Sequence, residues 1–349
     1  MKRSIFIALL ILASVVGWIG SGQFSNNVVA QDENTEISSD TELGSAEMHS
    51  EITGSVEYLA ENDEHGIEIA RQIVKSLNWN NTAHQTSMTA SPPKYKKDEI
   101  LGLVSTDYRK PYDVRELAAR LVDDSSFMEF KPRYGPTTVC LQTKIFNINC
   151  GIIGNNGPID PDGATKAAHF LQLCDHTNTP IIFLNNTTGF MVGKEYEHKG
   201  MIKHGSKMIQ AVTNVNVPKI SFYIGASFGA GNYGMCGYAF KPDFLFCWPN
   251  ATTGVMGGQQ AALTMEQVMV NAAKRRGKTL EAKTLNKQIE EIKDRFDSQS
   301  NAFLTSGRLL DHGMIDPRET RQVIGFCLNI CKESRSRKLK SNSFGIARM

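Results

Sequence analysis

The spacing of hydrophobic positions along the chain changes after residue 137 from isolated helical patterns to a regular alternation. Upstream, residues 62–77 and 112–122 each carry apolar side chains at i, i+3, i+4 and i+7, which predicts two amphipathic helices. Between them, residues 79–98 are rich in Asn, Ser, Thr, Pro and Lys, a composition typical of a linker. We expect a domain boundary in this segment.

Downstream, short apolar runs alternate with helical stretches. Strands are predicted at residues 137–146, 147–157, 180–186, 218–225 and 243–250. Helices are predicted at residues 162–175, 199–213, 259–275, 279–296 and 319–331. Asp162 is the expected cap of the first of these helices. Alternation of this kind predicts an α/β fold with a mostly parallel sheet.

Three of the predicted strands run directly into glycine-rich segments. They are followed by Gly189, by the stretch IGASFGAGNYGMCG at 224–237, and by Gly257-Gly258. Glycine allows tight turns and close approach of a ligand, and a following helix start adds unpaired N–H groups. We call these segments the glycine-rich exits of the strands. Because ligands bind beyond the carboxyl ends of parallel strands, we expect the exits to converge on one site. The alternative is a set of tight structural turns.

Side chains suited to acid–base or nucleophilic chemistry do not form a recognisable set. Ser227 lies in GASFG, which resembles a nucleophile elbow, but His312 is the only later histidine and no convincing acid precedes it. Four further histidines have no metal-ligand partner at a suitable spacing, and we expect no metal site: His169, His176, His198 and His204. The chemistry left is stabilisation of a developing oxyanion by backbone N–H groups, which suits thioesters or ureas.

Composition excludes several other classes of protein. Apolar residues make up 41% of the chain and charged residues 21%, as in ordinary soluble proteins. The formal net charge is +2 and no basic stripe stands out, so we expect no nucleic-acid partner. The seven cysteines include no CxxC pair, which argues against a disulfide framework and against zinc. Cys327 and Cys331 share one helical face, where core packing is their expected role.

The N-terminus gives a different indication. Lys2 and Arg3 precede an uncharged run that reaches Gln31, which is typical of a secretory signal or a membrane anchor. Secretion fits the remainder poorly because of the free thiols. It also conflicts with the glycosylation sequons, which lie at the ends of predicted buried strands: Asn185, Asn186 and Asn250.

Several long motifs resemble the carboxyltransferase (β) subunits of 3-methylcrotonoyl-CoA carboxylases, within the biotin-dependent acyl-CoA carboxylase family. They are IGASFGAGNYGMCG, WPNATTGVMGGQQAA, LNNTTGFMVGKEYEHKGMIKHGSKMI and the C-terminal FGIARM. The resemblance implies a crotonase-like ββα superhelix. It also implies a division into a hydrophobic leader, a remnant of the family's N-terminal domain, a linker and a carboxyltransferase C-terminal domain, at residues 1–31, 32–78, 79–98 and 99–349.

The same resemblance implies an enzyme of leucine catabolism in the mitochondrial matrix. It would move CO2 from carboxybiotin, carried by a partner α subunit, to 3-methylcrotonoyl-CoA, giving 3-methylglutaconyl-CoA, within an oligomeric core of β subunits. Two backbone oxyanion holes stabilise the two enolates in this family. The hole on the biotin side corresponds here to Gly229, Ala230 and Gly231. The implied lining of the biotin pocket is Gly189, Phe190, Met256, Gly257 and Gly258.

Two features depart from the family pattern. Most of the N-terminal half, with the acyl-CoA oxyanion hole, is not found in this sequence, and Gln259 stands where the family pattern has Glu. Two alternatives therefore remain: a catalytically incomplete subunit that only binds biotin or the α subunit, and a secreted or tethered binding module. For the enzyme hypothesis, we expect Gly231→Val to abolish carboxylation while leaving the fold mostly intact.

Overall fold

A computed structural model of the chain describes residues 39–53, 55–76, 90–107, 109–110, 112–277 and 281–337. The chain divides into two compact units, residues 1–81 with 338–349, and residues 82–337. The predicted leader and the FGIARM motif lie outside the described residues. In the smaller unit the predicted helix 62–77 is present as α4. The described elements of this unit are α2 (Asp40–Gly44), α3 (Ala46–Met48), the π-helical turn η1 (His49–Thr53) and α4 (Asp63–Ser76).

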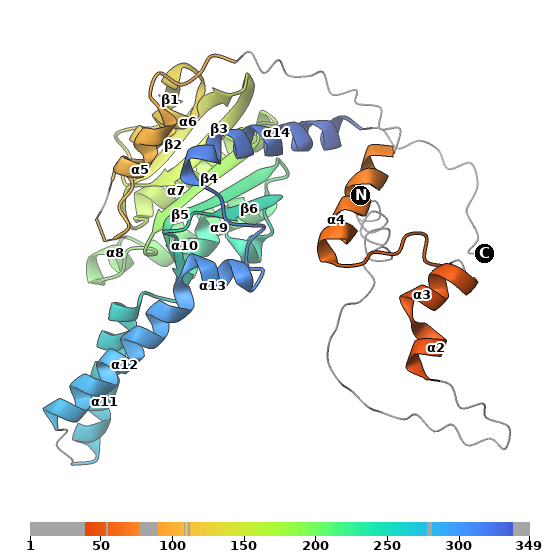
Figure 1. Cartoon of the computed structure of the whole chain (residues 1–349). Helices are drawn as coiled ribbons and strands as arrows, with labels where there is room; N and C mark the ends of the chain where they lie inside the picture. Colours follow the sequence, from red (N-terminus) through yellow and green to blue (C-terminus); the bar gives the residue numbers. More distant parts are fainter. Residues whose placement is uncertain are drawn as a thin grey trace. The chain divides into compact units, whose positions relative to one another are not determined.

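The larger unit is built on one mixed sheet with the strand order β1-β2-β3-β4-β5-β6 (Figure 1). β1, β2 and β3 pair antiparallel, whereas β3, β4, β5 and β6 pair parallel. β7 pairs parallel with the last residues of β5, beyond the part that β6 covers. The strands are β1 (Phe127–Glu129), β2 (Thr138–Ile145), β3 (Ile148–Asn155), β4 (Ile181–Thr187), β5 (Lys219–Phe228), β6 (Phe244–Cys247) and β7 (Thr252–Gly254). The sheet is thus mostly parallel, as predicted, with an antiparallel edge.

Helices cover both faces of this sheet. In β4, Ile182 and Leu184 join the core formed with α6 and α14, whereas Ile181 and Phe183 join the core formed with α7 and α9. Because neither face of β4 meets water there, its first four residues form a continuous apolar run. The covering helices are α5 (Ile100–Leu103), α6 (Val114–Leu121), α7 (Pro161–His176), α9 (Met201–Asn214) and α14 (Thr320–Ser336).

The cap of α7 differs from the prediction. Asp160, rather than Asp162, caps the helix, because its Oδ1 accepts a hydrogen bond from the Gly163 N–H at 2.7 Å. Pro161 follows as the first helical residue, a position that suits proline because the missing N–H would have no helical partner there. Asp162 lies inside the first turn.

A helical hairpin of α11 and α12 extends from the body of the larger unit (Figure 1). Apolar residues at helical spacing on α12 are half-buried: Leu285, Ile289, Ile292 and Phe296. The remaining helices are α8 (Lys194–His198), α10 (Gly229–Gly234), α11 (Gly258–Arg275), α12 (Ala282–Ser300) and α13 (Ala302–Gly307). Short 3-10 turns occupy Lys97–Glu99, Asp123–Ser125, Tyr238–Phe240 and Pro317–Glu319. In the part of the chain that the structure describes, no helix is both long and apolar enough to cross a membrane.

Candidate functional site

The glycine-rich exits of β4, β5 and β7 lie against one another at the carboxyl edge of the sheet. A Cβ placed on Gly231, after β5, would lie 2.7 Å from Cα of Gly189, after β4. A Cβ placed on Gly229 would lie 2.9 Å from the carbonyl oxygen of Val255, after β7. Such approaches are open only to glycine. The convergence predicted from the alternation of strands and helices is therefore present.

The turn from β5 into α10 brings the first backbone N–H groups of α10 to this edge. Gly229 begins α10 with a φ of 51°, and no side chain caps the helix, whose N-cap residue is the apolar Phe228. Ala230 is exposed and Gly229 is half-buried. The first N–H groups of a helix have no partner within the helix. Those of Gly229 and Ala230 therefore depend on partners outside the helix.

Gly189 and Phe190 have different surroundings. A Cβ on Gly189 would meet no atom within 4 Å, so this residue borders open space. The half-buried ring of Phe190 is wedged between two helices. It lies 3.4 Å from the Cβ position of Gly205 on α9 and 3.0 Å from that of Gly234 on α10. Its ring braces these helices behind the turn.

The third exit leads into α11. Gly257 is the N-cap residue of that helix and is buried, and Met256 before it is half-buried. The N–H of Gly258 donates to Oδ1 of Asp297 on α12 at 3.2 Å, and a Cβ on Gly258 would collide with the same carboxylate. Gly258 therefore holds α11 against α12. Sequence reasoning missed Asp297 because the two residues lie 39 positions apart.

Ser227 is not placed as a nucleophile. Its side chain is fully buried, and its hydroxyl donates to Oδ1 of Asn185 at 3.2 Å. Asn185 is equally buried, and its Nδ2 donates to the carbonyl of Met235 at 3.1 Å. A glycan cannot reach that nitrogen in the folded chain. All seven cysteines are buried free thiols, as the sequence predicted, and burial raises the pKa of the Cys236 thiol to about 12.

The histidines singled out from the sequence are dispersed. His204 Nδ1 lies 2.7 Å from Oγ1 of Thr165, and His169 Nδ1 lies 3.0 Å from Nζ of Lys131. Within the described ranges, no group of three or more His, Cys, Asp or Glu side chains is placed to hold a metal ion.

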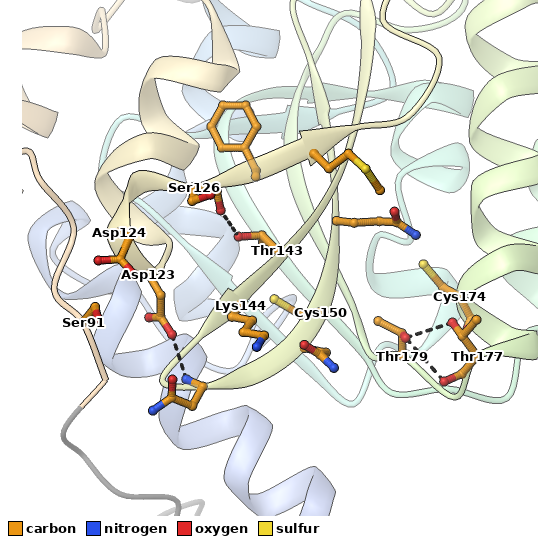
Figure 2. Close-up of a pocket in the computed structure, with 15 residues that line it drawn as sticks. Ser91, Asp123, Asp124, Ser126, Thr143, Lys144, Cys150, Cys174, Thr177 and Thr179 are labelled. Carbon is orange, nitrogen blue, oxygen red and sulfur yellow. Dashed lines mark hydrogen bonds between the residues drawn. The ribbon is translucent and has the colours of Figure 1, made fainter.

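A pocket of about 670 Å³ lies elsewhere, over the antiparallel strands β1, β2 and β3 (Figure 2). Several of its polar groups already have partners within the protein. Thr143 Oγ1 donates to the carbonyl of Ser126 at 2.7 Å, and Asp123 accepts from the Asn147 N–H at 2.8 Å. None of the glycine-rich exits lines this pocket. Its lining is Ser91, Asp123, Asp124, Ser126, Phe127, Met128, Gln142, Thr143, Lys144, Asn147, Asn149, Cys150, Cys174, Thr177 and Thr179.

Known proteins are similar to this chain in both sequence and fold. Residues 25–345 match the carboxyl transferase domain family. A relative from Drosophila melanogaster, named a probable mitochondrial methylcrotonoyl-CoA carboxylase beta chain, is 41% identical over 330 residues, covering 90% of this chain and 56% of the relative. The crystal structure of the geranyl-CoA carboxylase beta subunit from P. aeruginosa matches with a TM-score of 0.76 and 49% identity, covering 90% of this chain and 59% of that one.

A crystal structure of transcarboxylase 12S, described as a hexamer assembly, matches with a TM-score of 0.62 and 28% identity, covering 89% of this chain and 59% of that one. The chain thus spans between half and two thirds of the length of each of these proteins. The family model covers nearly the whole chain, and the solved structures share its sheet and helices. The chain therefore belongs to the carboxyl transferase domain family and has the crotonase-like α/β fold predicted from its motifs.

Proposed function

We propose that this chain is the carboxyltransferase (β) component of a biotin-dependent acyl-CoA carboxylase. The observation that carries the proposal is the uncapped turn at Gly229 and Ala230, where three strand exits meet in a chain of this family. Such a turn can donate two N–H groups to one oxygen without any acidic or basic side chain. Backbone donors of this kind typically contribute a factor of about 10²–10³ to the rate.

The residues at this edge fit biotin held by a partner α subunit. Biotin bound here would supply the carboxyl group and a ureido oxygen that accepts hydrogen bonds. In this proposal the N–H groups of Gly229 and Ala230 donate to that oxygen. Gly231 has no Cβ, which allows α10 to lie against Gly189.

The pocket walls have distinct proposed roles. The open space at Gly189 admits the ring, and Phe190 fixes the spacing of α9 and α10. Met256 and Gly257 form the opposite wall, and Gly258 anchors that wall through Asp297. No metal takes part in these roles.

The acyl substrate we propose is 3-methylcrotonoyl-CoA, which would place the chain in leucine catabolism. The Drosophila relative is named for this substrate, and the solved neighbour at 49% identity is named for geranyl-CoA. Both acyl groups are 3-methyl-branched 2-enoyl thioesters. Geranyl-CoA is therefore the competing substrate that an assay has to include.

The proposed setting is an oligomeric core of β chains with biotin-carrying α subunits, in the mitochondrial matrix. The hexamer described for transcarboxylase 12S supports the oligomer, and the mitochondrial name of the Drosophila relative supports the location. Burial of the acceptor nitrogen of Asn185 weighs against the secreted alternative.

The test measures fixation of labelled bicarbonate into each acyl-CoA by the purified chain with a biotin-loaded α subunit. A second reaction adds a full-length β subunit to supply an N-terminal half. In that subunit the turn that corresponds to Gly229–Gly231 is inactivated by mutation, so that it cannot react by itself. We expect acid-stable label in 3-methylcrotonoyl-CoA, and more of it than in geranyl-CoA. Failure to label either thioester in both reactions would contradict the proposal.

The second candidate function is binding of the biotin-carrying partner without turnover. It needs only the open space at Gly189 and the residues around it, without donation from the N–H groups of the turn. Calorimetric titration with biotinylated carrier domain separates the two candidates. Binding without label in either reaction above selects the second, and binding with label selects the first.

A further inference from the structure

A chain of buried hydrogen bonds lies beneath α10 and begins at Asn232. Its Nδ2 donates to Oγ of Ser227 at 2.9 Å and to Oη of Tyr223 at 3.0 Å. Both acceptors belong to β5, and their side chains are 0% and 2% exposed. One amide group therefore joins α10 to the strand that leads into it.

The same chain continues to β4 and returns to the end of α10. Ser227 Oγ donates to Asn185 Oδ1 at 3.2 Å, and Asn185 Nδ2 donates to the carbonyl of Met235 at 3.1 Å. Met235 is the C-cap residue of α10. Since the Ser227 hydroxyl uses its hydrogen on Asn185, its lone pairs are left to accept from Asn232. The donors and acceptors are consistent along the whole path, which ties the second half of α10, at Asn232, and its C-cap residue Met235 to the sheet.

Little within α10 itself could hold it in place. It has six residues, three of them glycine, and no side chain caps its start. Glycine is a poor helix former, and isolated helices of this length are marginal in water. The position of the turn therefore depends on contacts with the sheet.

We propose that Asn232 is the positioning residue of the turn from Gly229 to Gly231. By donating to Ser227 and Tyr223 at once, its amide fixes the direction in which the N–H groups of that turn point. Asn232 touches neither biotin nor the acyl group in this role. That the turn serves carboxylation rests on the proposed function. The effect of Asn232 on the position of the turn is measurable in the isolated full chain.

The first test substitutes Asn232→Asp, which keeps the shape and removes both N–H donors. Two-dimensional NMR of the ¹⁵N-labelled chain follows the Ala230 and Gly231 amide signals and the exchange rate of the Met235 N–H. That N–H donates to the Gly231 carbonyl at 3.0 Å and so reports the turn directly. At pH 8 we expect displaced signals and exchange at least tenfold faster than in the wild type.

A matched control is Thr320→Val, which removes a buried hydrogen bond far along the chain. Oγ1 of Thr320 accepts from Nε1 of Trp248 at 2.9 Å, and its side chain is fully buried. We expect this variant to lower the melting temperature while leaving Met235 exchange within twofold of the wild type. Should Asn232→Asp fail to fold, Tyr223→Phe is the second variant. It removes the Oη that accepts from Asn232 and from the Tyr238 N–H, keeps the bond from Asn232 to Ser227, and is expected to shift the same signals by a smaller amount.

Carboxylation with the biotin-loaded partner supplies an independent readout. We expect Asn232→Asp to lower kcat at least tenfold with KM for acyl-CoA within twofold, and Thr320→Val to change neither. Unchanged Met235 exchange in Asn232→Asp, or an equal change in Thr320→Val, would overturn the proposal. If the wild type proves inactive but Asn232→Asp still loosens the turn, the positioning role stands and the proposed function fails.

Discussion

The larger unit has two regions that differ in how their polar groups are paired: the pocket over β1, β2 and β3, and the edge formed by the glycine-rich exits. The pocket over β1, β2 and β3 has a volume of about 670 Å³, and polar groups in its wall, such as Thr143 and Asp123, bond to neighbouring backbone (Figure 2). The edge formed by the exits of β4, β5 and β7 is closely packed, with Gly231 against Gly189. Its first-turn N–H groups, however, have no side-chain cap.

In the proposed function, helix-start donors without a side-chain cap, rather than the size of a cavity, locate the chemistry. Burying or enclosing a polar group without a partner is costly, so most such groups are paired. The start of α10, where three strands end, has no side-chain cap and so departs from the usual capping of helix starts. Such departures are expected at functional sites. The predictions below test the contrast between the two regions, beginning with the largest expected effect.

Removing one of the helix-start donors should have the largest effect. Ala230→Pro deletes a single N–H, and proline is tolerated in the first turn of a helix. We expect kcat for carboxylation to fall by about 10²–10³, equivalent to about 2.7–4 kcal/mol of barrier. Ala230→Ser keeps the N–H and serves as the control, with kcat close to the wild type. Equal rates for the two variants would break the assignment of this turn.

The second prediction concerns the contact between the exits. A Cβ at position 231 would lie 2.7 Å from Cα of Gly189 and 3.1 Å from Cγ2 of Thr187, so Gly231→Val must displace the end of β4. The expectation that this variant leaves the fold mostly intact is therefore replaced by a loss of about 1–3 kcal/mol in unfolding free energy. Urea unfolding measures the loss. Gly102→Val is the control, since a Cβ there meets no atom within 4 Å.

Local patterns in the sequence predicted much of the fold. The predicted helix 259–275 begins one residue earlier in the structure, and the predicted strand 180–186 is β4 displaced by one residue. Both have strong periodicity or a continuous apolar run, which depend on neighbouring residues alone. The three-residue strands β1 and β7 were missed because each is defined by pairing with a distant strand.

The position of the candidate site was predictable from the sequence, but its contacts were not. Glycines that follow strands identified the edge, since the topology of a parallel sheet brings strand ends together. The partners of these glycines were not predictable. Asp297 meets Gly258 across 39 positions, and Ser227 meets Asn185 across 42, and no local signal connects residues so far apart. The structure was needed to distinguish a glycine with open space, Gly189, from one that anchors a helix, Gly258.

The third prediction concerns a buried, weakly hydrogen-bonded side chain that we expect to affect stability and not carboxylation. Lys166 on α7 is fully buried, and its Nζ has a long hydrogen bond of 3.4 Å to the Lys131 carbonyl. Lys166 lines neither the pocket over β1, β2 and β3 nor the edge formed by the glycine-rich exits, so we expect a role in stability alone. Lys166→Met should raise the unfolding free energy at pH 7 by about 1 kcal/mol or more, because an apolar side chain replaces a poorly paired charge. Carboxylation should be unchanged.

The pH dependence follows from the pKa of Lys166, which burial lowers from its usual 10.5. Below the folded-state pKa both states hold the proton, and the full penalty of burying the charge is present. As pH rises through the folded-state pKa toward 10.5, the native side chain becomes neutral first and the penalty fades. The advantage of Lys166→Met should therefore be largest at neutral pH and shrink on the alkaline side. Urea unfolding of both proteins from pH 7 to pH 10 measures it, and a widening gap would contradict the argument.

The smallest effect is expected at the pocket over β1, β2 and β3. The double substitution Gln142→Ala and Lys144→Ala removes two side chains that line it, one half-buried and one exposed. Surface changes of this kind usually alter unfolding free energy by no more than about 0.5 kcal/mol. Carboxylation should stay within twofold of the wild type, because neither side chain belongs to the strand exits. A tenfold loss would make this pocket a second functional region and would remove the contrast on which the assignment of the glycine edge depends.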